Sequence, residues 1–335
     1  MSHLRYVRGK SVDPTKYTHL PLEVSPAIEA LKDVVFSHPA VKTLEAFGDN
    51  LASRPLTRDE VRILLASEGL FVLEVPPGVL ALSSRITDEC FETDPFQATG
   101  RAARVLFAAI DEYGLNAMEN GLLPSHHQLY ADMAAHWGIT AQELLDSRYC
   151  VPTGREFGKV IRRYYREAPI VEALGFHVAN EATAPLDFGV FLKTFQTHRE
   201  FYGLKAENDS VLNFLLVHDD VEVSHREMGV EMVQLYTDGD AEMIDRARKG
   251  VLDYMDIYGR FFAELSDAMF GKRAYLRGAK ASYGMAGRHD RVGRIPEWRI
   301  AYAGQCRGRL RIRRLLARVL RLAWARESRS RRIPG

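Results

Sequence analysis

The segment Phe214-Leu-Leu-Val-His218-Asp-Asp-Val-Glu222-Val-Ser-His225 combines an apolar run with three side chains that commonly bind metals. Spacings of four and seven residues place His218, Glu222 and His225 on one face of a helix, one turn apart. The apolar neighbours predict that this helix is buried, where unpaired ionisable groups are costly. Two imidazoles and a carboxylate on one stripe suit iron, manganese or zinc, so the segment predicts a metal-binding helix. The alternative is an exposed polar face that carries two incidental histidines.

A second group of candidate ligands, Glu112, Glu119 and His126, lies upstream at intervals of seven residues. An uninterrupted helix would place all three on one side, but Gly121 and Pro124 predict a break before His126. The alternative for the glutamates is a solvated helix face, where glutamate usually lies. The spacing leaves open whether Glu112 or Glu119 supplies the carboxylate.

A third candidate ligand is Glu181, near the end of an otherwise apolar helical stretch. An acidic side chain on such a face is unusual without a partner, so Glu181 is interpreted as a bridging carboxylate between the other two groups. Carboxylates and histidines from separate helices are the ligand set with which helical bundles hold two iron ions. The remaining helical histidines His136, His177 and His198 are interpreted as packing or surface residues.

Helical periodicity dominates the rest of the chain, and strict period-two alternation is hard to find, so the fold class predicted is all-α. Ser25-Pro26 is typical of an N-cap followed by proline at the first helical position, and Thr57-Arg-Asp-Glu60 is a capping box. Further helices are expected at residues 79–92, 97–118, 123–137, 140–147, 155–183, 187–202, 207–236 and 238–269. We therefore expect an extended arm at 1–24, a helical domain at 25–270 and an Arg-rich segment at 271–335.

Composition restricts the class of protein. The chain has 335 residues, of which 46% are apolar and 27% charged, as in ordinary globular proteins. Its three cysteines are far apart, which argues against a disulfide scaffold or a thiolate metal site and favours a reducing cytoplasm. We expect no secretory signal at the N-terminus and, because no run of 18 apolar residues occurs, no membrane span.

Charge is distributed unevenly along the chain. Residues 271–335 carry 19 Lys and Arg against 3 Asp and Glu, whereas the rest of the chain has an excess of acidic side chains. Residues 309–326 can form a basic amphipathic helix, so the tail is expected to be a peripheral helix or disordered. Such a tail suggests a rival function, binding of nucleic acid or another anionic polymer. Few aromatic residues interleave with the arginines, and no recognised nucleic-acid motif is present, so nucleic acid is not the expected partner.

The ordered set of Glu112 or Glu119, His126, Glu181, and then His218, Glu222 and His225 resembles the haem-oxygenase-like di-iron oxidases. That family has a carboxylate and a histidine on one core helix, a glutamate on a later helix, and then H-x3-[DE]-x2-H. The resemblance covers roughly residues 60–265. Glu222 stands where the family commonly has aspartate.

The resemblance implies a haem-oxygenase-like helical bundle that holds two Fe(II) per chain, uses O2 as co-substrate and receives electrons from an external donor. It also implies oxidation of a small metabolite, often in natural-product biosynthesis. The additional carboxylate Glu119 favours N-oxygenation of an amine or amino acid; the alternative within the family is oxidative decarboxylation or another C–C cleavage. Arg162 is a candidate for binding a substrate carboxylate. No membrane partner is expected, and a homodimer is left open.

Overall fold

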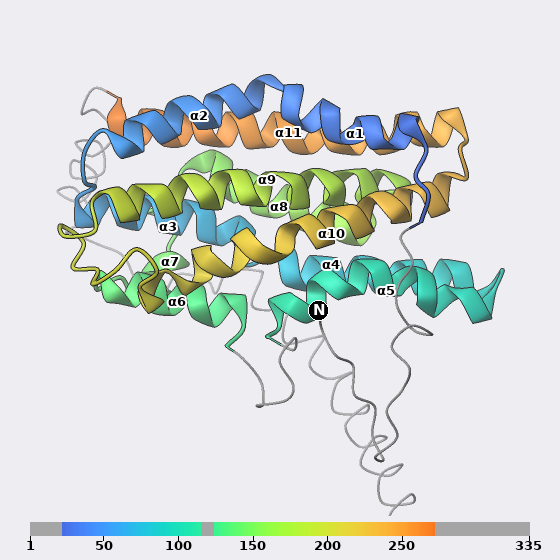
Figure 1. Cartoon of the computed structure of the whole chain (residues 1–335), viewed down its shortest axis with the longest axis horizontal. Helices are drawn as coiled ribbons and strands as arrows, with labels where there is room; N and C mark the ends of the chain where they lie inside the picture. Colours follow the sequence, from blue (N-terminus) through green and yellow to red (C-terminus); the bar gives the residue numbers. More distant parts are fainter. Residues whose placement is uncertain (1–21, 115–123, 272–335) are drawn as a thin grey trace, which may run out of the picture. The chain divides into compact units, whose positions relative to one another are not determined.

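The computed structural model describes residues 22–114 and 124–271, and these residues form helices and no strand (Figure 1). The all-α prediction is therefore confirmed. The helices are α1 (Pro26–Ser37), α2 (Pro39–Ala52), α3 (Arg58–Val72), α4 (Val75–Phe91), α5 (Pro95–Glu112), α6 (His126–His136), α7 (Ala141–Leu144), α8 (Pro152–Glu167), α9 (Ile170–Thr197), the 3-10 helix η3 (Ser210–Leu212), α10 (Asn213–Thr237) and α11 (Ala241–Phe270). The arm at 1–24 and the basic segment at 271–335 lie almost entirely outside the described residues and stay predictions.

Two helices begin at the N-cap residues that the sequence predicts. Pro26 opens α1 after the N-cap Ser25. The Thr57 side chain accepts a hydrogen bond from the backbone N–H of Glu60, while the Glu60 carboxylate accepts one from the backbone N–H of Thr57. This capping box satisfies two of the amide donors that a helix start leaves unpaired.

The predicted boundary between helices at 155–183 and 187–202 is wrong. Pro169 ends α8 and precedes α9, which then continues through Pro185 to Thr197. Proline before a helix start costs nothing, whereas proline inside a helix removes one hydrogen bond. The burial of almost every residue of α9 before Pro185 offsets that loss. Pro185 has no amide hydrogen, so the carbonyl of Glu181, four residues earlier, loses its usual helical donor.

The long helix α9 is the central element of the bundle, packing against α10, α11, α1, α2, α4 and α8 (Figure 1). Its backbone lies very close to that of α11. A Cβ atom added at Gly175 would lie 1.8 Å from the carbonyl oxygen of Ala247, and one added at Gly250 would lie 2.0 Å from that of Glu172. Only glycine allows this approach, which fixes the position of α9 and of the polar residues it carries.

One helical stretch in the described part of the chain, Arg58–Phe91, is long and apolar enough to cross a membrane. It comprises α3 and α4, and 67% of its most apolar window is buried inside the bundle. The apolar side chains of α3 and α4 thus form part of the protein core, which is the ordinary reason for such a composition.

The Glu60→Gln variant tests the capping box through its pH dependence. Burial would raise the pKa of Glu60, but hydrogen bonds from Arg54 and Thr57 outweigh it and lower the pKa below its usual value. A lowered folded-state pKa stabilises the protein above the unfolded-state pKa, and this contribution is lost as pH falls through the folded-state pKa. Glu60→Gln is therefore expected to cost about 1 kcal/mol at pH 7. Denaturant unfolding should give the wild type and Glu60→Gln converging free energies of unfolding below about pH 4. A difference that persists in acid would show that the stabilisation does not come from the Glu60 charge.

Candidate metal centre

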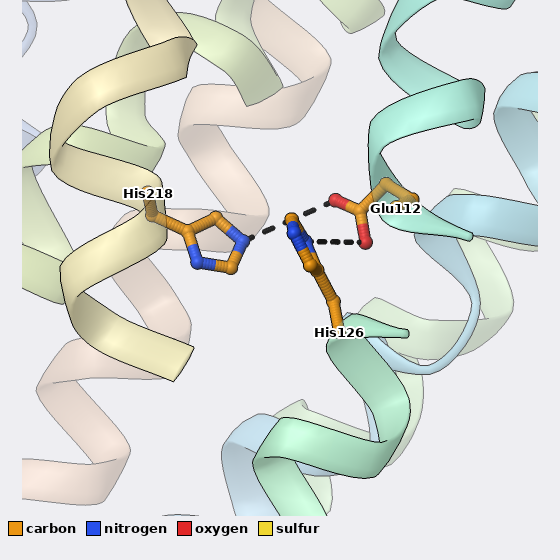
Figure 2. A group of neighbouring side chains, drawn as sticks. All are labelled: Glu112, His126 and His218. Carbon is orange, nitrogen blue, oxygen red and sulfur yellow. Dashed lines mark ion pairs between the residues drawn. The ribbon is translucent and has the colours of Figure 1, made fainter. Parts of the chain in front are cut away.

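Three of the predicted ligands meet at one point, although they come from three helices. Glu112 ends α5, His126 begins α6 and His218 lies in α10 (Figure 2). One donor atom from each lies within 4.8 Å of the other two. His126 Nδ1 lies 2.9 Å from Glu112 Oε2, and His218 Nε2 lies 4.0 Å from Glu112 Oε1. We name these three residues the first cluster.

Local chain geometry brings Glu112 and His126 together. Gly114 adopts a φ of 73°, and its N–H donates to the carbonyl of Asp111, which ends α5 at Glu112. The hydroxyl of Ser125 accepts a hydrogen bond from the N–H of Gln128, so α6 begins at His126. Helix ends thus orient both side chains, in agreement with the predicted break before His126.

The His218 imidazole is neutral, which is the form in which histidine binds a metal. Burial lowers its pKa to about 3, with the neighbouring His126 adding to the effect. Its Nδ1 lies 2.5 Å from the carbonyl oxygen of Phe214, and only an N–H can donate to that oxygen. The proton therefore lies on Nδ1, which leaves the Nε2 lone pair directed at Glu112.

His126 and Glu112 form a charge-coupled pair. Burial alone would lower the pKa of His126, but the nearby Glu112 carboxylate outweighs burial and raises it. The Glu112 carboxylate therefore favours a positive charge on its neighbour. A divalent ion held by both side chains would supply that charge, and His126 would bind it in the deprotonated form.

A second cluster surrounds His225 and consists of Asp111, Glu181 and His225, with His177 behind Glu181. His225 Nδ1 lies 3.4 Å from Glu181 Oε2, and His225 Nε2 lies 3.7 Å from Asp111 Oδ2. On the other side, His177 Nδ1 lies 3.2 Å from Glu181 Oε1 and 3.1 Å from the Tyr165 hydroxyl. Burial would raise the pKa of Glu181, but His177 and His225 outweigh it and hold the pKa well below its usual range. Glu181 is therefore an ionised carboxylate between two imidazoles.

Residues of both clusters line one cavity of about 30 Å³. Glu112 and His218 contribute from the first cluster, and Glu181 from the second. The remaining lining is mainly apolar, apart from Asn180, Asp187 and Tyr254; the apolar residues are Phe71, Val72, Val75, Ala184 and Phe188. Such a lining excludes bulk water while leaving polar atoms of both clusters accessible from the same space.

The donor atoms fit a divalent first-row metal ion. Oxygen and imidazole nitrogen are the ligands that such ions accept, and neighbouring donors around one ion are separated by roughly 3–4 Å. The distances of 2.9 and 4.0 Å in the first cluster are of this size. The buried carboxylates also need positive partners, which metal ions would provide. Glu112, His126 and His218 would hold one ion. In the second cluster, Glu181 and Asp111 approach opposite ring nitrogens of His225, so these three side chains do not surround a single point.

Residues 72–259 match the model of a haem-oxygenase-type family described as iron-containing redox enzymes. The chain belongs to this family. Its fold is a haem-oxygenase-like helical bundle, and the family assignment makes iron the expected metal and redox chemistry the expected reaction class. No curated protein matches the chain at a significant level.

A solved structure with a TM-score above 0.5 shares the fold of this family member. A CADD-like protein of unknown function from Nostoc punctiforme superposes with a TM-score of 0.56 at 14% identity, over 72% of this chain and 96% of the other. A domain of unknown function with a haem-oxygenase-like fold from Shewanella denitrificans gives a TM-score of 0.48 at 13% identity, over 85% of this chain and 100% of the other. At these identities the likeness concerns the fold alone.

The other predicted site residues lie elsewhere or outside the described structure. Glu119 falls in 115–123, outside the described residues, and the Glu222 side chain is not described either, although its backbone belongs to α10. Arg162 is paired with Glu74, its side chain is 58% exposed, and it does not line the cavity. The structure therefore does not bring Arg162 to the clusters.

Two residues in or beside the second cluster, Asp111 and His177, are not among the ligands that the sequence predicts. His177, predicted to be a packing or surface histidine, is fully buried and faces Glu181 one helical turn away. Its spacing of four residues from Glu181 was a usable signal, because residues four apart share a helix face. Asp111 is not among the predicted ligands, because its neighbour Glu112 fits the ligand pattern, yet Asp111 is the residue that approaches His225.

Proposed function

We propose that this family member is a non-haem di-iron oxidase that uses O2 to N-oxygenate a small amine or amino acid. The observation that carries the proposal is the cavity onto which both carboxylate–histidine clusters open. Two ferrous ions held there would supply O2 activation and reducing equivalents, with further electrons from an external donor. The balanced reaction is RNH2 + O2 + two electrons + two protons giving RNHOH + H2O.

The chain's own residues hold the candidate ligands in fixed orientations beside a mainly apolar cavity. Phe188 and Phe214 pack against the His218 ring, with ring centroids 4.3 and 4.6 Å away, and fix its orientation. His177 and Tyr165 support Glu181 from behind, which limits the directions in which its carboxylate can point. Phe71, Val72 and Val75 cover the cavity and exclude water, so that electrostatic interactions inside it are strong.

Two further expectations belong to this proposal. Cys90 and Cys150 are both free and buried, in keeping with the reducing cytoplasm expected from the sequence. The basic segment 271–335 lies outside the described residues, and we expect it to be a docking segment of an otherwise acidic chain rather than a nucleic-acid module.

Product analysis tests the proposal. The iron-loaded protein is mixed with 18O2, a reductant and either small amines or fatty acids, and products are identified by mass spectrometry. A hydroxylamine that carries one 18O atom and forms only in the presence of iron supports N-oxygenation. Release of CO2 from a fatty acid, with no amine product, would replace it by the decarboxylase alternative.

A further inference from the structure

A pair of buried carboxyl groups lies beside the cavity but belongs to neither cluster. Asp187 of α9 lines the cavity, together with Glu112, Glu181 and His218, and is only 2% exposed. Glu68 of α3 is 1% exposed, and its charge interacts with that of Asp187. Two buried acidic side chains from separate helices thus interact electrostatically, and one of them, Asp187, lines the space where a substrate would react.

Glu68 lacks hydrogen-bond partners in the described part of the chain. Neither of its carboxyl oxygens finds a donor, although both are inaccessible to solvent. Asp187 accepts a hydrogen bond of 2.8 Å from the backbone N–H of Phe188. No described lysine, arginine or histidine forms an ion pair with either carboxyl group. Unpartnered buried carboxyl oxygens are rare and costly, so their presence requires a reason.

Three tyrosines lie close to the pair. Tyr254 and Tyr258 of α11 lie near Asp187, and Tyr130 of α6 lies near Glu68. Burial raises the pKa of Glu68 well above its usual range, with the charge of Asp187 adding to it, and burial also raises the pKa of Asp187. Burial likewise raises the pKa of each of the three tyrosines, so they stay neutral. The pair is therefore short of a positive partner.

We propose that Asp187, supported by Glu68, binds the ammonium group of the amine substrate in the cavity next to the two metal clusters. The inference rests on the proposed function, to which it adds a residue that selects amines. A cation hydrogen-bonded to Asp187 supplies the missing positive charge, and a cavity of about 30 Å³ has room for a small cationic headgroup. Transfer of one proton from the ammonium nitrogen to the Asp187 carboxylate leaves a neutral amine with a free electron pair.

Binding of methylammonium tests this inference independently of turnover. The iron-loaded protein is titrated anaerobically with methylammonium chloride at constant ionic strength in a calorimeter, with methanol as a neutral ligand of similar size. Methylammonium is expected to bind, and methanol is not. Asp187→Asn is expected to weaken methylammonium binding by about 10-fold or more, the effect of losing a charge-assisted hydrogen bond. Glu68→Gln should weaken it less, because Glu68 acts through Asp187.

The matched control is Asp256→Asn, which removes the same charge from a side chain that is 72% exposed. It should bind methylammonium as the wild type does. Both buried variants should keep their iron and their melting temperature, since an amide relieves the repulsion between two buried acids. Equal methylammonium affinity in the wild type and Asp187→Asn would overturn the inference. An Asp187→Asn enzyme with an unchanged KM for amines and a reduced kcat would also overturn the inference. In that case the pair would act as a proton source and would not bind the ammonium group. The binding result does not depend on whether hydroxylamine is the product.

Discussion

The His218→Ala variant is expected to lose the iron of the first cluster and about 1000-fold or more of its iron-dependent O2 consumption. His218 offers a neutral Nε2 toward Glu112 and His126, and no other described side chain lies where it could replace that nitrogen. Loss of a residue that only supports a metal ligand already costs roughly 10–100-fold, so loss of a ligand should cost more. The measurements are iron content after anaerobic loading and the rate of O2 uptake.

His136→Ala is the matched control for this experiment, because His136 is an exposed histidine on α6 whose ring contacts the carbonyl oxygen of Tyr202. It should retain full iron content and activity. If His218→Ala kept both as well, the first cluster would not be a metal site.

The Glu181→Gln variant is expected to retain about one iron per chain and to lose about 100-fold or more in O2 consumption. Glutamine preserves the size of the side chain but removes the negative charge that lies between His177 and His225. Because Glu181 has a strongly lowered pKa, its charge is present throughout the neutral pH range. The iron contents of Glu181→Gln and His218→Ala, measured in parallel, show whether the two clusters bind iron separately.

Thr183→Val offers a control on the same helix, since Thr183 is buried and its hydroxyl contacts that of Tyr254 without reaching either cluster. It should leave the iron content at the wild-type value. An unchanged iron content in Glu181→Gln would show that Glu181 is a structural ion-pair partner instead of a ligand.

Much of the fold and part of the site follow from local sequence patterns. The spacing of His218 and His225 placed both on one helix, and the capping box at Thr57 gave the start of α3. These features depend only on helical geometry and on hydrogen bonds between residues a few positions apart. Glycine and proline likewise predicted the break between Glu112 and His126.

Contacts between distant segments determine those features of the fold and site that the sequence did not predict. The course of α9 through Pro185 depends on its burial against α10 and α11, which no local pattern encodes. The assignment of Asp111 to the second cluster depends on how α5 faces α10. The meeting of Glu68 with Asp187 likewise requires the positions of α3 and α9, and an isolated glutamate in an apolar stretch gives no sign of its partner.

Anaerobic titration of the protein with Fe(II), followed by rapid mixing with O2, tests the central proposal that the site holds two irons. The wild type should bind about two Fe(II) per chain and show a visible absorption that forms and decays after mixing. His225→Ala should bind about one and show no such absorption. Binding of a single iron by both proteins, or of none above background, would contradict the di-iron centre.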